Sequence, residues 1–506
     1  MTALPQHSLP PAYADLFARH AEIGALEECG AILSWDQSVT MPPGGAAARG
    51  EQFAALSAAT HRLAVDPAIG TLLDRAEAGE AKALPADHAA NLMLMRRGYT
   101  RRIALPESLV SAFARATTAC ETTWRTARKN SDFAAVAPIL AEVVQLARDT
   151  ARRLAEATGL APYDALMDGF QRGMHSDHVA PLFDDLEKFL PPLIEARLAA
   201  QAAGTPPIRP RGPFPIEAQK RLARRMAEAA GLDFNAARLD ESTHPFSGGT
   251  PDDTRITARY REDDFAQAVL AVLHECGHAL YQKNLPAGLR RQPAGDAAGM
   301  AVHESQSLIM EMQACRGDAF LGWLAPVLRE AFGADPAFDS ANLAKLWRQV
   351  HKGFIRVEAD ELTYPLHVIL RFRLERALIA GDLEVPGLPA AWNAGFKTLF
   401  GEAPPDDARG CLQDIHWYTG AFGYFPAYTL GAIAAAQLFQ AATAADPGIE
   451  AGLGRGDFAP LLAWNRTHVH AHGAMLDLDG VLRAATGQPL EIGPFHRHLL
   501  ARYGGV

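Results

Sequence analysis

Hydrophobic residues recur every three to four positions through most of the first 200 residues, which is the spacing of one face of an α-helix. In the segment 12–33, for example, Leu16 and Ile23 fall near one side of the predicted helix. The same spacing predicts further helices over 46–64, 69–82 and 84–103, after Pro106, and over 177–203. The stretch 35–45 is interpreted as a break. This part of the chain is therefore expected to be nearly all helical, with short loops.

The proline-rich segment 204–215 is the clearest interruption of this pattern. It contains five prolines, which fix the backbone and exclude a regular helix. Two interpretations stay open, a boundary between two lobes or a long surface connection within one fold. We take the chain as a single domain, 1–506, with a sub-lobe break in this segment.

The pattern changes after the prolines. A helix is predicted over 216–230, and two extended pieces follow at 237–240 and 254–260. The second piece alternates between polar and apolar residues, which is typical of a half-buried strand. The predicted fold class is therefore mainly α, with a small β-sheet just before the next helix.

An apolar helix over 265–273 leads directly into the motif HECGH at 274–278, and two aspartates precede it where helix-end amides favour negative charge. Residues four apart share one face of a helix, so His274 and His278 can place two imidazole nitrogens on one metal ion. Glu275 is rotated by about 100° and flanks that ion, where it can take a proton from water. This is the arrangement of a zinc peptidase.

The same motif also occurs by chance in long proteins, where its histidines are ordinary surface or core residues. Here it continues a strongly apolar helix, so its three polar side chains enter a buried environment. An unsatisfied buried polar group costs roughly 2–7 kcal/mol, and a bound metal removes that cost. We therefore prefer the metal interpretation.

A catalytic zinc site needs a third protein ligand. The next apolar helix, 301–311, offers Glu304 and Glu311, and a loop rich in glycine and proline allows the chain to double back. Glu304 lies nearer the helix start, but the spacing alone leaves the choice close to even.

Composition narrows the class of protein. The 506 residues are 48% hydrophobic and 21% charged, as in ordinary globular proteins. The net charge of -10 argues against nonspecific nucleic-acid binding. Five scattered cysteines without CxxC spacing predict neither a disulfide framework nor a thiolate zinc site, and they fit a reduced, cytoplasmic protein.

No membrane association is expected. The N-terminus lacks the basic and apolar regions of a signal peptide. Residues 415–445 contain no Asp, Glu, Lys or Arg, but Pro426, Gln437 and many small residues make this stretch too weakly hydrophobic for a span. It is interpreted as a buried helix that starts near Tyr428.

Six short motifs follow one another along the chain. They are HPF at 244–246, DTRIT at 253–257, HECGH at 274–278, HESQ at 303–306, IRVEAD at 355–360 and GCLQDIHW at 410–417. In this order they resemble the motifs of the carboxypeptidase Taq family of zinc metallocarboxypeptidases. The segments WDQ at 35–37, MPPG at 41–44 and GYFPAY at 423–428 fit as well. The resemblance spans nearly the whole chain, with no departure at a motif position.

The resemblance implies one zinc ion per chain, bound by His274, His278 and Glu304, with Glu275 as general base. The site is also expected to accept other divalent metals, such as Co2+ or Mn2+, in place of zinc. The resemblance also implies release of single amino acids from peptides with a free C-terminus. For the architecture, it implies a mainly helical, saddle-like fold with a deep groove near the small sheet, usually as a homodimer.

Peptide hydrolysis needs a second hydrogen-bond donor, besides the metal, for the oxyanion that forms. His416, Tyr424 and Tyr428 are available in the charge-free stretch. We choose His416 first and Tyr428 second as catalytic donors, and we assign Tyr424 to substrate binding. For either tyrosine alone, a buried aromatic residue with one hydrogen bond is the better interpretation. His244 is a further candidate for lining the groove, although a lone loop histidine is more often structural.

An exopeptidase must also bind a free carboxylate, which suits the two-pronged guanidinium of arginine. Arg356 is the leading candidate. Because 355–364 is interpreted as a helix, the alternative is a plain Arg356–Asp360 helix pair, worth about 0.3–0.5 kcal/mol. Arg255 is the second candidate, and its alternative is a strand residue paired with Asp253.

Other functions agree with parts of this pattern. An oligopeptidase or peptidyl-dipeptidase with the same metal centre would not need the carboxylate-binding arginine, and this alternative stays open. A noncatalytic scaffold would have no use for Glu275. An aminopeptidase is disfavoured because no Gly-x-Met-Glu-Asn segment precedes the metal helix. His468, His470 and His472 could chelate a second metal if extended, but in a helix only the first and last share a face.

Overall fold

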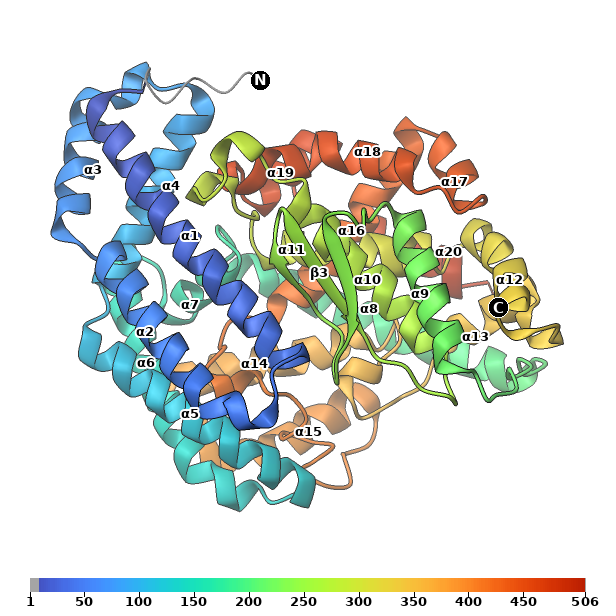
Figure 1. The fold of residues 1–506 in the computed structure, drawn as a ribbon. Helices are drawn as coiled ribbons and strands as arrows, with labels where there is room; N and C mark the ends of the chain where they lie inside the picture. Colours follow the sequence, from blue (N-terminus) through green and yellow to red (C-terminus); the bar gives the residue numbers. More distant parts are fainter. Residues whose placement is uncertain (1–8, 506) are drawn as a thin grey trace. The chain divides into compact units, whose positions relative to one another are not determined.

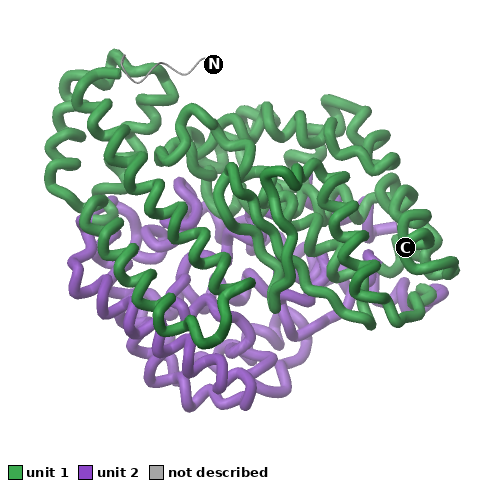
Figure 2. Tube along the Cα trace, in the orientation of Figure 1, with its two compact units in different colours: residues 1–102, 207–346, 434–490 green, residues 103–206, 347–433, 491–506 purple. Residues whose placement is uncertain are grey.

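The computed structural model describes residues 9–505. The chain divides into two compact units, coloured separately in Figure 2. Unit 1 comprises 1–102, 207–346 and 434–490, and unit 2 comprises 103–206, 347–433 and 491–506. One passage between the units falls at 206–207, inside the proline-rich segment 204–215. The assignment of the chain to one domain stays a prediction.

Unit 1 combines helices with a small sheet (Figure 1). Its elements are α1 (Pro11–Val39), α2 (Ala46–Ala64), α3 (Pro67–Gly79), α4 (Ala86–Ile103), α9 (Ile216–Ala230), β1 (Ala237–Glu241), β2 (Ser247–Thr250), β3 (Asp253–Ala258), α10 (Ala266–Lys283), α11 (Met300–Leu308), α12 (Asp318–Phe332), α13 (Ser340–Trp347), α17 (Gly448–Leu453), α18 (Ala459–His468) and α19 (Leu478–Thr486). Helix α10, which carries HECGH, lies against β3, α9 and α11. The sheet and these two helices therefore hold the motif from several sides.

Unit 2 is helical throughout its described elements. They are α5 (Glu107–Asn130), α6 (Phe133–Thr158), α7 (Pro162–Phe170), α8 (Ser176–Ala203), α14 (Tyr364–Ala380), α15 (Leu388–Phe400) and α20 (Gly493–Tyr503). Helix α14 lies against α6, α7, α8 and α15. Helix α14 is thus surrounded by other helices, and most of its side chains are buried, including several polar ones.

The sheet has the strand order β1-β3-β2, with β1 parallel and β2 antiparallel to β3. The register pairs Ala237 with Thr254, and Ser247 with Ile256. Two of these strands were predicted, at nearly the observed positions. Strand β2 was not, because its sequence, Ser-Gly-Gly-Thr, has little preference for a strand outside this pairing.

The prediction of a mainly helical fold with a small sheet is confirmed, but two local predictions were wrong and one helix was missed. Helix α1 continues to Val39, so the segment 35–37 is helical rather than part of a break. Helix α7 was not predicted. The segment 355–364 contains a single 3-10 turn, Arg356–Glu358, and helix α14 begins only at Tyr364.

The charge-free stretch forms helix α16 (Pro426–Ala445), which begins two residues before the expected start at Tyr428. Most of its side chains are buried, and none of them is Asp, Glu, Lys or Arg. Within residues 9–505, no helix combines the length and the hydropathy needed to cross a membrane.

Candidate metal centre and arginine cluster

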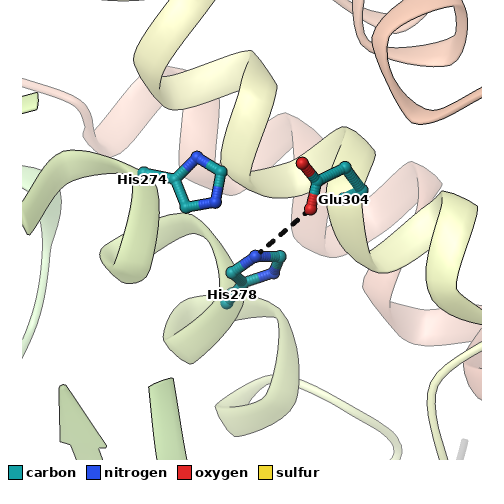
Figure 3. Close-up of side chains that lie close together, drawn as sticks. All are labelled: His274, His278 and Glu304. Atoms are coloured by element: carbon teal, nitrogen blue, oxygen red, sulfur yellow. Dashed lines mark ion pairs between the residues drawn. The ribbon is translucent and has the colours of Figure 1, made fainter. Parts of the chain in front are cut away.

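His274 and His278 project from α10 toward Glu304 on α11 (Figure 3). One ligand atom from each of these three side chains lies within 4.8 Å of the other two. His278 Nε2 and Glu304 Oε2 are 3.5 Å apart. Two imidazoles and a carboxylate fit a divalent ion such as zinc, which takes three protein ligands in catalytic sites. Among residues 9–505, this is the only converging group of three or more such side chains.

Gly277 allows the two ligand helices to approach each other closely. A Cβ atom at this position would lie 2.3 Å from the Gln306 carbonyl oxygen and 2.5 Å from the Ser307 Cα. Both are backbone atoms of α11, so they cannot move aside as a flexible side chain would. The glycine inside HECGH therefore sets how near Glu304 comes to the two histidines.

The ring nitrogens that face away from Glu304 have partners of their own. His274 Nδ1 lies 3.0 Å from Glu311 Oε2, and Arg316 Nη2 donates to the other Glu311 oxygen at 2.7 Å. His278 Nδ1 lies 2.7 Å from His303 Nδ1. Histidines that bind metals usually engage their second nitrogen in this way, which fixes the ring orientation.

The electrostatics of this group favour a bound cation. Burial lowers the pKa of His274, but the hydrogen bond to Glu311 and the nearby carboxylates outweigh it and raise the pKa to about 10. Burial raises the pKa of Glu311, but His274 and Arg316 bring it down to about 2. Burial also raises the pKa of Glu275, which is only 7% exposed. The proton that His274 holds among these carboxylates is one that a divalent ion could replace.

His303 stays neutral in this arrangement. Burial and the neighbouring His278 keep the pKa of His303 well below its usual value. A neutral His303 can accept a hydrogen bond from His278 Nδ1–H, while His278 Nε2 lies on the side of Glu304. The sequence gives His303 no role beyond its place in the motif HESQ, because spacing does not reveal which rings meet in the fold.

Glu311 lies in a π-helical turn, Ile309–Ala314, that follows α11. In a continuous α-helix, Glu311 would share a face with Glu304, seven residues earlier. The π turn instead brings its carboxylate to the Nδ1 side of His274. Such turns are rare and are often found at functional sites. On a regular helix, Glu304 and Glu311 would be nearly equal candidates for the third metal ligand. In the structure only Glu304 converges with the two histidines, and Glu311 contacts the other side of His274.

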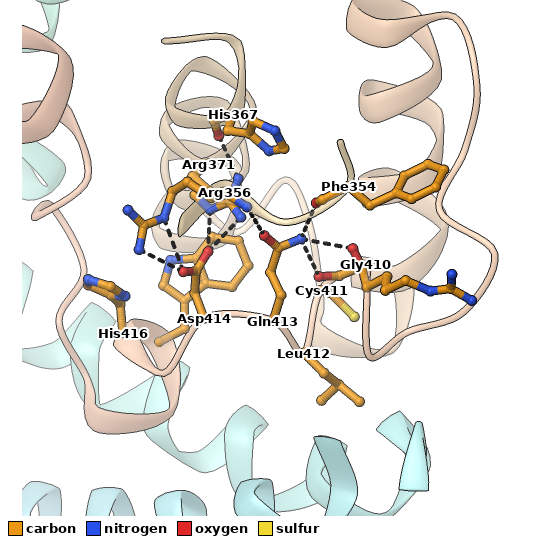
Figure 4. A network of polar contacts seen from close by, with 12 residues as sticks. Phe354, Arg356, His367, Arg371, Gly410, Cys411, Leu412, Gln413, Asp414 and His416 are labelled. Carbon is orange, nitrogen blue, oxygen red and sulfur yellow. Dashed lines mark hydrogen bonds and ion pairs between the residues drawn. The ribbon is translucent and has the colours of Figure 1, made fainter. Parts of the chain in front are cut away.

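Arg356 in unit 2 belongs to a buried cluster with Arg371 and Asp414, which we call the arginine cluster (Figure 4). Asp414 Oδ1 accepts from Arg356 Nε at 3.1 Å and from Nη2 at 2.9 Å. Asp414 Oδ2 accepts from Arg371 Nε at 2.6 Å. The expected alternative, an Arg356–Asp360 helix pair, was wrong because this segment is not helical. Asp360 instead accepts from the backbone amides of residues 351, 362 and 363.

His416 and Tyr428 are hydrogen-bonded to each other, with 3.1 Å between His416 Nε2 and the Tyr428 hydroxyl. The Tyr424 ring lies 5.4 Å from the His416 ring and 5.2 Å from the Tyr428 ring. The Arg356 guanidinium lies 4.7 Å from the Tyr428 ring centre. Burial lowers the pKa of His416 to about 3, so its imidazole is neutral. The structure thus groups these four predicted residues within unit 2.

The remaining sequence candidates lie in unit 1. Arg255 on β3 donates to Asp253 at 2.9 Å through Nε, and its guanidinium lies 4.6 Å from the Trp35 ring centre. His244 lies in the connection between β1 and β2, where its carbonyl accepts from Ser242 Oγ at 2.6 Å.

The three histidines near residue 470 have separate surroundings. His468 stacks on Trp464 at 4.4 Å between ring centres, and His470 Nε2 lies 2.9 Å from Gln306 Oε1. His472 is half-buried and belongs to the following 3-10 turn.

A helix with HExxH spacing and a glutamate from the next helix define the site of a metallopeptidase. The chain belongs to the carboxypeptidase Taq (M32) metallopeptidase family, whose sequence model matches residues 15–503. The enzyme is therefore a metallocarboxypeptidase of the carboxypeptidase Taq type, and the family implies a divalent metal.

Known relatives are similar to this chain over nearly its full length. Thermostable carboxypeptidase 1 of Thermus thermophilus is 38% identical over 506 residues, which cover 98% of this chain and 99% of the relative. Carboxypeptidase 1 of Bacillus subtilis is 33% identical, with 99% of each chain covered. Among solved structures, Trypanosoma cruzi metallocarboxypeptidase 1 matches with a TM-score of 0.95 and 38% identity, covering 97% of this chain and 99% of that one.

Proposed function

We propose that this enzyme is a zinc-dependent carboxypeptidase that releases single amino acids from the free C-termini of peptides. The observation that carries the proposal is the convergence of His274, His278 and Glu304, with the buried Glu275 next to His274 on the same helix. This donor set suits zinc, and Co2+ or Mn2+ can occupy the same kind of site. When bound, the ion supplies Lewis acidity that polarises the scissile carbonyl and makes water easier to deprotonate.

The side chains of the enzyme then handle the protons and the charges. Glu275 is proposed as the general base that takes a proton from the attacking water and later gives it to the leaving amine. The raised pKa of Glu275, caused mainly by burial, favours both the uptake and the return of that proton. His416 and Tyr428, bonded to each other, are proposed as donors to the developing oxyanion.

Arg356 is proposed to bind the C-terminal carboxylate of the substrate. A guanidinium can hold a carboxylate through two parallel hydrogen bonds, and Arg356 is a buried cation lying over the Tyr428 ring. Tyr424, next to His416 and Tyr428, is proposed to contact the substrate. Arg255 is the weaker candidate for the carboxylate because its charge is matched by Asp253 on its own strand, whereas Asp414 is shared between Arg356 and Arg371.

The roles are tested by one substitution and one pair of substrates. Glu275→Gln keeps the shape of the side chain but removes its basicity, so we expect the variant to retain zinc and lose at least about 1,000-fold in kcat. Metal content is measured by elemental analysis. Unchanged turnover with the metal bound would remove Glu275 from the mechanism.

The substrate pair consists of one peptide with a free C-terminus and the same peptide as its C-terminal amide. A carboxypeptidase is expected to release the last residue of the acid and to lose nearly all activity on the amide. An oligopeptidase or peptidyl-dipeptidase that does not read the carboxylate would cleave both. Mass spectrometry of the products, with and without a chelator, separates these outcomes.

A further inference from the structure

The arginine cluster holds more positive than negative charge in a buried place. The side chains of Arg356, Arg371 and Asp414 are 6%, 0% and 10% exposed. Within residues 9–505, Asp414 is the only carboxylate that pairs with either guanidinium. Two guanidiniums against one carboxylate leave one positive charge without a counter-charge. Because an uncompensated buried charge is costly, this cluster is suited to receive an anion.

The neighbouring ionisable groups do not supply that negative charge directly. His416 is neutral, since burial lowers its pKa to about 3. Glu375, one turn beyond Arg371 on α14, accepts hydrogen bonds from the Tyr163 hydroxyl at 2.8 Å, Trp417 Nε1 at 2.8 Å and the Gly423 amide at 3.1 Å. Its carboxylate is therefore held by these three donors, and no hydrogen bond joins it to either guanidinium in the part of the chain described.

Arg356 keeps donors to spare in this network. A guanidinium has five N–H groups. Two are bonded to Asp414 Oδ1, and a third, on Nη1, is bonded to the Tyr364 hydroxyl at 3.1 Å. Two N–H groups therefore have no bond among the described residues, which is the number that a carboxylate needs for a bidentate contact.

Arg371 is fully buried and bonded to Asp414, so it is positioned to orient Asp414 rather than to contact a substrate. Its Nε donates to Asp414 Oδ2 at 2.6 Å, and its Nη1 donates to the His367 carbonyl at 2.7 Å. The guanidinium lies 4.6 Å from the Trp392 ring centre, and the side chain is fully buried. Arg371 thus fixes one oxygen of Asp414 and offsets its charge, while Arg356 is bonded to the other oxygen.

We propose that Arg371 is a positioning residue for carboxylate recognition. By binding Asp414 Oδ2 and offsetting the charge of Asp414, it leaves Arg356 able to attract the C-terminal carboxylate of a peptide. This inference rests on the proposed function of Arg356. Without Arg371, the full negative charge of Asp414 falls on Arg356 and repels the incoming carboxylate.

A double-mutant cycle in the Glu275→Gln background tests this role. Binding of one peptide acid and its C-terminal amide to the zinc-loaded, full-length protein is measured by titration calorimetry. Arg371→Met is expected to weaken binding of the acid by about 10- to 100-fold and binding of the amide by less than about threefold. In an Asp414→Asn background the same Arg371→Met change should weaken acid binding by less than about threefold, because no charge is left to offset. Arg371→Lys, which keeps the charge, should retain most of the preference for the acid.

Arg376→Met is the matched control, because Arg376 lies on the same helix but is exposed. It should leave both affinities unchanged. Equal weakening of acid and amide by Arg371→Met, or an equal effect in both backgrounds, would overturn the role of Arg371. If Arg371→Met does not fold, Arg371→Lys decides the question, and loss of its preference for the acid overturns the proposal.

The failure of the two proposals can be told apart. If the parent protein binds acid and amide equally, carboxylate recognition by Arg356 fails, and the role of Arg371 fails with it. If the parent prefers the acid and that preference survives Arg371→Met, only the role of Arg371 is overturned.

Discussion

The metal centre of unit 1 and the arginine cluster of unit 2 bury charge in opposite ways. Around His274 and His278, three carboxylates gather with two positive groups, the Arg316 guanidinium and the protonated His274, so negative charge is in excess. In the arginine cluster, two guanidiniums share one carboxylate, so positive charge is in excess. Each excess is opposite in sign to the group that the region is proposed to bind, a metal cation in one and a peptide carboxylate in the other. A buried charge imbalance of this kind points to a ligand rather than to a purely structural ion pair.

The largest effect is expected from a substitution that disturbs the metal centre of unit 1 and leaves the arginine cluster unchanged. Gly277→Ala places a Cβ 2.3 Å from the Gln306 carbonyl oxygen, so the backbone of α11 must move away from α10 and carry Glu304 with it. A displacement near 1 Å at a catalytic group costs about 100-fold in rate, and we expect a loss of that size in kcat together with weaker metal retention. Zinc content after dialysis and kcat provide the measurement.

The control for this substitution is Gly322→Ala in α12. No atom lies within 4 Å of the Cβ that it would add, and Gly322 is also helical. This variant should keep its metal and its activity. Full metal retention in Gly277→Ala would show that the close approach of the two helices does not determine the site.

A smaller effect is expected from a substitution next to the metal ligands. Glu311→Gln preserves the shape of the side chain and an acceptor for His274, but it removes one of the three negative charges. Groups that orient a metal-binding histidine typically change metal affinity by about 10- to 100-fold, and we expect zinc to leave that much faster. The rate of zinc loss to a chromogenic chelator measures the effect. The exposed Glu330→Gln variant is the control, and equal rates in the two variants would contradict the role of Glu311.

The two regions also differ in how far the sequence could predict them. His274, Glu275 and His278 follow from one helix, because residues four apart share a face and the helix formed as expected. The helical pattern likewise located most of α2, α4 and α9. Periodicity reports on local structure, so it is reliable where the site residues belong to one regular element.

The arginine cluster could not be predicted in the same way, because it forms through contacts between residues that are distant in the sequence. Arg356 was interpreted through a helix that does not form, and its partner, Asp414, is 58 residues away in the chain. Arg371 was missed because an arginine in an apolar helix has no spacing that reveals its partner. The same holds for Glu311, whose position depends on a π turn that no regular pattern predicts. A charged residue within a strongly apolar segment was the one signal available for Arg371.

The last prediction concerns the charge balance of unit 2. Burial raises the pKa of Glu375 from 4.5 to about 7, so the folded protein keeps this proton to a higher pH than the unfolded chain does. The contribution of Glu375 to stability is therefore greatest below about pH 4.5 and falls as the pH rises toward 7. Between pH 5 and 8 the free energy of unfolding should decrease by on the order of 2 kcal/mol through this group. Glu375→Gln does not titrate, so denaturant unfolding of the variant should lack that decrease, and parallel pH profiles would contradict the prediction.

Ionisation of Glu375 would also reduce the excess positive charge of the arginine cluster, since Glu375 lies one turn from Arg371. The preference for a peptide acid over its amide should therefore weaken above pH 7 in the parent protein more than in Glu375→Gln.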